Sequence, residues 1–118
     1  MKENALKKKS FDFALRIVKM YTYLKEEKKE YIMSKQLMRA GTSVGAMVRE
    51  AEFAESKSDF VHKMAIAQKE INETLYWLEL LNASEYITIQ QFESINSDAV
   101  EIIKLITATL KTAKNINH

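Results

Sequence analysis

The strongest fold signal lies in residues 58–82, SDFVHKMAIAQKEINETLYWLELLN. Apolar side chains recur there at spacings of three and four, beginning with Phe60, Met64 and Ala67. This period predicts an amphipathic helix with one face packed on a core. Such a helix spans roughly 37 Å, a length typical of a helical bundle.

The same period occurs in three other parts of the chain. We expect helices at about residues 10–27, 34–54, 58–82 and 88–114. Short connections join them, which predicts an all-α fold, an antiparallel up-down-up-down four-helix bundle. Ser10 is the expected N-cap of the first helix, and Thr88 with Gln91 resembles a capping box. We expect residues 1–9 to form a basic N-terminal tail and residues 10–118 a single domain.

The first helical segment carries two neighbouring apolar rows. One row includes Phe11, Leu15 and Val18, and the other includes Phe13 and Ile17. Together they make a wide apolar stripe, and we expect that stripe to pack on the core.

Composition restricts the classes of protein to which the chain can belong. Its 118 residues include 18 Lys and Arg, 16 Asp and Glu, two Gly, no Pro and no Cys. This length fits one domain that buries about 65% of its unfolded surface. The lack of Cys excludes disulfides and thiolate metal sites. No secretory signal or run of 18 uncharged apolar residues is present, so we expect no membrane contact and a cytoplasmic location.

Charge is unevenly distributed along the chain. Residues 1–49 hold 12 basic and 5 acidic residues, whereas residues 50–101 hold 3 basic and 11 acidic ones. One interpretation is that oppositely charged helix faces meet, within one chain or between copies. The other is a basic surface that attracts phosphate.

Gly41 and Gly45, the only glycines, fall inside the second helical segment. A glycine costs a helix interior about 1 kcal/mol relative to alanine. Either the helix kinks near Gly41, or a second backbone approaches closely. We favour a continuous helix with close packing, at a contact between helices or between subunits.

Motifs for catalysis or metal binding are missing. The chain has two histidines, too few for a di-metal carboxylate site, and His62 is better explained as a surface or interface residue. It lacks G-x-S-x-G and a phosphate-binding loop. We therefore expect no catalytic residue, no metal site and no cofactor.

A concentrated polar pattern lies on the second and third segments. We interpret it as a structural ion-pair network of Arg49, Glu50, Lys63, Lys69, Glu70 and Glu73. The alternative is that Glu70 and Glu73 are paired carboxylates for acid–base catalysis. Tyr76 and Trp77 lie off the main apolar row, which suggests a second contact surface. Because these segments are apolar on more than one side, we expect self-association.

Three blocks resemble a known family. They are SKQLMRAGTSVGA (34–46), AESKSDFVHK (54–63) and IAQKEINETLYWLELL (66–81). In this order they resemble the four-helix-bundle proteins encoded in intervening sequences of bacterial 23S ribosomal RNA genes. The similarity covers nearly the whole chain.

That resemblance implies a four-helix bundle assembled into a pentameric ring. The chain is also similar to the accessory variability determinant of diversity-generating retroelements, a basic pentamer that binds a reverse transcriptase and nucleic acid. The resemblance implies no enzyme activity.

Three hypotheses about function stay open. The first is a non-catalytic oligomeric scaffold or adaptor for RNA, DNA or a nucleic-acid enzyme, the second a purely protein-binding accessory module, and the third an enzyme using Glu70 and Glu73. The candidate contacts for nucleic acid or a partner are Lys7, Lys8, Lys9, Arg16, Lys19 and Arg39.

Overall fold

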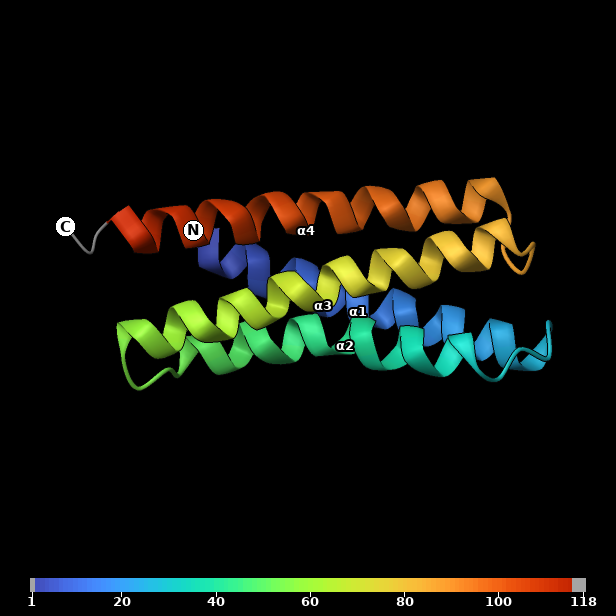
Figure 1. Cartoon of the computed structure of the whole chain (residues 1–118), viewed down its shortest axis with the longest axis horizontal. Helices are drawn as coiled ribbons and strands as arrows, with labels where there is room; N and C mark the ends of the chain where they lie inside the picture. The colour runs from blue at the N-terminus through green and yellow to red at the C-terminus, as the bar shows by residue number, and fades with distance from the viewer. Residues whose placement is uncertain (1, 116–118) are drawn as a thin grey trace.

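Four helices account for most of the chain in a computed structural model, which describes residues 2–115 (Figure 1). They are α1 (Lys2–Glu26), α2 (Met33–Glu52), α3 (Lys57–Ala83) and α4 (Ile89–Asn115), and the described residues contain no strand. The all-α prediction is therefore confirmed. The expected tail at residues 1–9 is wrong, because α1 already begins at Lys2 and Ser10 lies inside it rather than at its N-cap.

The helices are arranged as an elongated bundle. Each packs on two neighbours, in the pairs α1–α2, α2–α3, α3–α4 and α1–α4, and the whole measures 50 × 22 × 20 Å. Successive helices run in opposite directions, so the start of α1 and the end of α4 lie at the same end (Figure 1). The connections are short, which makes antiparallel neighbours the natural arrangement.

Each helix contributes one row of side chains to the core. The largest fully buried ones include Phe13, Ile17, Leu24, Leu37, Val44, Ile71, Leu78, Ile95, Ile102 and Ile106. Consecutive positions within each helix are separated by four or seven residues, so they fall on one face.

Only one of the two apolar rows of α1 enters the core. Phe13 and Ile17 are buried, whereas Phe11, Leu15 and Val18 are 48%, 47% and 37% exposed. The expectation that the whole stripe faces the core is therefore wrong. The two rows lie on different sides of α1, so they cannot both point toward the centre of the bundle. The row of Phe11, Leu15 and Val18 lies outside, and we call it the α1 outer row.

The starts of α3 and α4 are each capped by the side chain of the N-cap residue. At α4, the Thr88 N–H donates to Gln91 Oε1 over 2.8 Å, and the Gln91 N–H donates to Thr88 Oγ1 over 3.1 Å. This confirms the capping box. At α3, the Asp59 N–H donates to Ser56 Oγ over 3.0 Å, so Ser56 is the N-cap.

The start of α2 is capped by Glu30, which lies in the charged connection between α1 and α2. Its carboxylate accepts the backbone N–H groups of Ile32, Met33 and Ser34 at 3.1, 3.0 and 2.7 Å. The Glu30 residue is only 6% exposed. Burial by itself would raise the pKa of this carboxyl, but the bonds from Met33, Ser34 and Ile32 outweigh it and hold the pKa below the usual value.

Within residues 2–115, no helix is both long enough and apolar enough to cross a bilayer.

Candidate interaction surfaces

The glycine pair lies at the contact between α1 and α2, inside one chain. A Cβ added at Gly41 would stand 2.6 Å from Ile17 Cγ1, and one added at Gly45 would stand 3.3 Å from the Ser10 carbonyl oxygen. Helix α2 continues unbroken through both positions. The glycines therefore serve close helix packing here, rather than a kink.

The six residues of the expected ion-pair network do not form one connected network. Lys63 Nζ donates to Glu50 Oε1 over 2.9 Å, and this hydrogen bond raises the pKa of Lys63. Arg49 instead lies over the Phe11 ring, with its guanidinium carbon 5.4 Å from the ring centre. Lys69 joins none of the ion pairs found within residues 2–115.

Glu70 and Glu73 meet Arg39 of α2. Arg39 Nη1 donates to Glu70 Oε1 over 3.2 Å, and Arg39 Nη2 forms a short contact with Glu73 Oε2. Trp77 Nε1 also donates to Glu73 Oε2, over 3.0 Å. These four residues, the Arg39 cluster, join α2 to α3. Because both carboxylates are held by a guanidinium, the arrangement does not favour their use as a free acid–base pair.

Removing the charge of Arg39 should destabilise the α2–α3 contact. In Arg39→Met, two carboxylates one helical turn apart would repel each other, and the Glu70 side chain is only 13% exposed. We expect the free energy of unfolding to fall by about 1–2 kcal/mol. The matched control is Lys8→Met, which breaks an exposed pair with Asp12 and should cost about 0.5 kcal/mol or less. Equal urea midpoints for the two variants would contradict this.

Tyr76 and Trp77 occupy different environments. Their rings meet edge to face at 5.0 Å. Trp77 is half-buried and packs against the core, whereas Tyr76 is 56% exposed. Of the two aromatics predicted at a contact surface, Tyr76 is the one turned outward.

Most of the candidate cations already have acidic partners. Lys7 pairs with Glu52, Lys8 with Asp12 and Lys9 with Glu101, at 3.0, 2.9 and 3.0 Å respectively. Arg16 pairs with Asp98 at 2.8 Å, and Arg39 belongs to its own cluster. Among the six candidates, Lys19 alone takes part in none of the ion pairs formed by the described residues. These six candidates therefore do not form one unpaired cationic patch.

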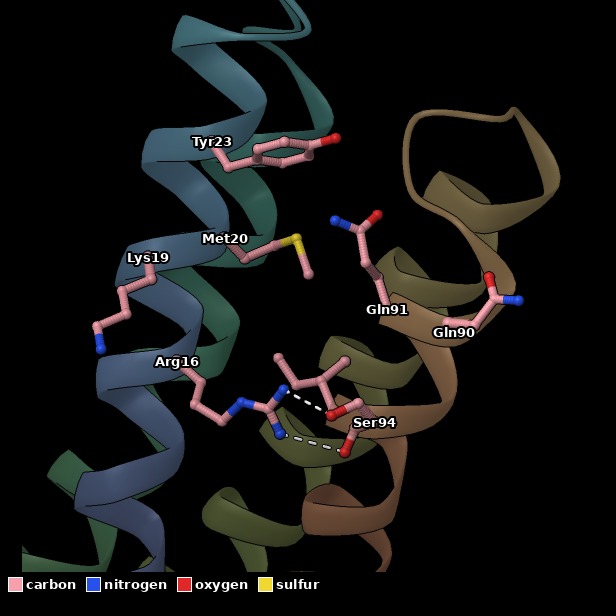
Figure 2. A pocket seen from close by; sticks show the side chains of 8 residues that line it. Arg16, Lys19, Met20, Tyr23, Gln90, Gln91 and Ser94 are labelled. Carbon is pink, nitrogen blue, oxygen red and sulfur yellow. Dashed lines mark hydrogen bonds between the residues drawn. The ribbon is translucent and has the colours of Figure 1, made fainter.

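A groove between α1 and α4 was not foreseen from the sequence. It has a volume of about 590 Å³ and is lined by Arg16, Lys19, Met20, Tyr23, Gln90, Gln91, Ser94 and Ile95 (Figure 2). Arg16 closes one end, because its guanidinium donates to the Ser94 carbonyl and hydroxyl at 3.1 and 2.9 Å. No group of three or more potential metal-binding side chains occurs in the part of the chain that the structure describes.

Comparison with known proteins agrees with this architecture. The family model described as "23S rRNA-intervening sequence protein" matches residues 2–108. The chain belongs to this family. The resemblance of the three sequence blocks is thereby confirmed.

A solved structure of a similar protein has the same fold as this 23S rRNA-intervening sequence protein. A Bacteroides thetaiotaomicron protein of the S23 ribosomal protein family, described as having unknown function, is 57% identical. The match covers 94% of this chain and 99% of that chain, with a TM-score of 0.93. No curated protein matches the chain.

Proposed function

We propose that this protein is a non-catalytic scaffold in which several copies assemble and act as an adaptor for RNA, DNA or a nucleic-acid enzyme. The α1 outer row is the observation that carries the proposal. Single exposed apolar side chains are ordinary on a protein surface. Three large ones at positions i, i+4 and i+7 instead make a continuous face of the kind that docks against a partner.

A second copy of the chain is the partner that best suits this face. The α1 half of the sequence is basic and the α3 region is acidic, so opposite charges can guide two copies together. Arg49 already shields one side of Phe11, so Leu15 and Val18 are the members of the row left for contact with a partner. The pentameric ring implied by the family resemblance is the assembly we expect.

Light scattering after size exclusion tests the assembly. We expect the wild-type protein to have a mass several times 13.7 kDa, and Val18→Lys to shift it toward the monomer, because a buried unpaired charge is costly. Val100→Lys is the matched control, since Val100 on α4 is also 37% exposed. A monomeric wild type would overturn the proposal, as would a Val18→Lys variant that assembles like the Val100→Lys control.

The nucleic-acid role has its own support and its own test. The ion pairs of Lys7, Lys8, Lys9 and Arg16 are largely exposed, so each is worth only about 0–1 kcal/mol and phosphate can compete for the cations. We expect binding of RNA or duplex DNA at low salt that weakens steeply as salt rises. Absence of binding at low salt would remove this part of the proposal.

A purely protein-binding module is the second candidate. The observation that favours it is that five of the six candidate cations already have intramolecular partners, which weakens their pull on phosphate. If this second candidate is right, the wild-type protein should assemble but should not bind the RNA or DNA probes. A partner that stays bound after nuclease treatment would then distinguish it.

A further inference from the structure

The α1–α4 groove is lined by apolar and aromatic side chains, by amide and hydroxyl groups, and by basic side chains. Met20 and Tyr23 of α1 form one wall, and Gln90, Gln91 and Ser94 of α4 form the other, together with the buried Ile95. Figure 2 shows the Tyr23 ring and the Met20 thioether directed from α1 toward α4. The volume of about 590 Å³ lies within the range of small-ligand sites.

Capping fixes the orientation of one amide in the groove. Gln91 Oε1 is occupied by the Thr88 N–H at 2.8 Å, so its Nε2 group stays available as a donor. In Figure 2 this nitrogen points across the groove toward Met20. The groove therefore offers an oriented hydrogen-bond donor beside a flat aromatic surface, and this pairing suits a planar ring that carries a carbonyl oxygen.

The two cations of the groove differ in availability. The Arg16 guanidinium is held by Ser94 and Asp98, which makes it a fixed end wall. Lys19 is exposed and takes part in none of the ion pairs formed by side chains of residues 5–115. It lies one turn before Tyr23 and borders the groove, but Figure 2 shows its ammonium extending to the side of α1 away from α4, so it can reach only a phosphate outside the groove. A lysine ammonium in this position can bind a phosphate as a point charge.

We propose that the α1–α4 groove binds an unpaired nucleotide of a single-stranded RNA or DNA chain. The base stacks on Tyr23 against Met20, a base carbonyl accepts from Gln91 Nε2, and the adjacent phosphate lies outside the groove, within reach of Lys19. Stacking requires an exposed base face, which a duplex does not offer, so the groove selects single strands. This inference rests on the nucleic-acid part of the proposed function.

Fluorescence anisotropy with a short labelled oligouridine tests the site, with oligothymidine, a duplex of equal length and free UMP as comparison probes. We expect the single strands to bind more tightly than the duplex or UMP. Tyr23→Leu should weaken oligouridine binding about 5- to 100-fold, the range for loss of one base–aromatic stack. Lys19→Gln should lower the slope of log affinity against log salt by about 0.7, the value for one phosphate of a single strand.

The controls are Tyr76→Leu and Lys35→Gln, which remove an exposed ring and an exposed ammonium outside the groove; both should bind like wild type. Because Tyr23 also contacts the core, circular dichroism checks that Tyr23→Leu is folded. If Tyr23→Leu is unfolded, the Lys19→Gln variant carries the test instead. Wild type that binds none of the probes overturns both the groove and the nucleic-acid role. If wild type binds the single strand, but Lys19→Gln and a folded Tyr23→Leu bind it just as wild type does, the groove proposal alone is overturned. A preference for the duplex, or equal affinity for UMP, also overturns the groove proposal alone.

Discussion

Replacing Gly41 by leucine is expected to destabilise the bundle more than any other single change considered. The first added atom, Cβ, would stand 2.6 and 2.9 Å from Cγ1 and Cγ2 of Ile17. Ile17 is fully buried, and its branched side chain has little freedom to turn aside. Overpacking costs about 1–3 kcal/mol or more, which exceeds the roughly 1 kcal/mol gained by removing a helical glycine. We expect the free energy of unfolding, measured in urea, to fall by about 2 kcal/mol or more.

Two further variants separate a local clash from a general intolerance. Gly45→Ala should have a smaller effect, because its Cβ would lie 3.3 Å from the Ser10 carbonyl oxygen. In an Ile17→Ala background the space next to Gly41 opens, so Gly41→Ala should cost less there than in the wild type. If Gly41→Leu unfolds at the wild-type urea concentration, the contact between α1 and α2 is not as close as described.

Helix period and capping chemistry explain why the fold followed from the sequence. The spacing of apolar residues depends only on local geometry, and Thr88 and Gln91 cap each other within one turn. The start of α1 was missed because the lysine-rich residues before Ser10 show weak apolar periodicity. Leu6 there is buried, which ties the first turns of α1 to the core.

What the sequence does not encode locally is which partner each side chain meets. The two apolar rows on α1 cannot be told apart by their spacing in the sequence. Only the packing of α2 and α4 against α1 determines that the row of Phe13 is buried. Lys9 and Glu101, or Arg16 and Asp98, are far apart in the chain, and only the closed bundle brings them within 3.0 and 2.8 Å. The groove was missed for the same reason, because its two walls come from the first and last helices.

The two proposed binding surfaces occupy different sides of α1. Phe11 of the α1 outer row contacts Arg49 of α2, whereas Tyr23 faces the groove shared with α4 and Lys19 borders it. A substitution such as Val18→Lys therefore tests assembly without touching the groove lining. Lys19→Gln likewise tests the groove without adding charge to the outer row, so the two hypotheses can fail independently.

Loss of the Glu30 carboxylate is the second large effect that we expect. It holds three backbone N–H groups at the start of α2, which would otherwise lack helical partners. Glu30→Ala should lower the free energy of unfolding by about 2 kcal/mol, the scale of a strong cap. Glu30→Gln keeps the shape but loses the charge and one acceptor, and should cost about 1 kcal/mol. Glu27→Gln, in the same connection and exposed, is the control and should change little.

The pH dependence of the Glu30 variants has a definite sign. Because the folded-state pKa of Glu30 lies below the usual value, the charged carboxylate favours the folded protein. Its stabilisation is complete above the unfolded-state pKa of about 4.3 and is lost as pH falls through the lower folded-state value. The stability gap between wild type and Glu30→Gln should therefore be constant near neutral pH and should narrow below about pH 4. A gap that widens on acidification would show that the cap does not act through its charge.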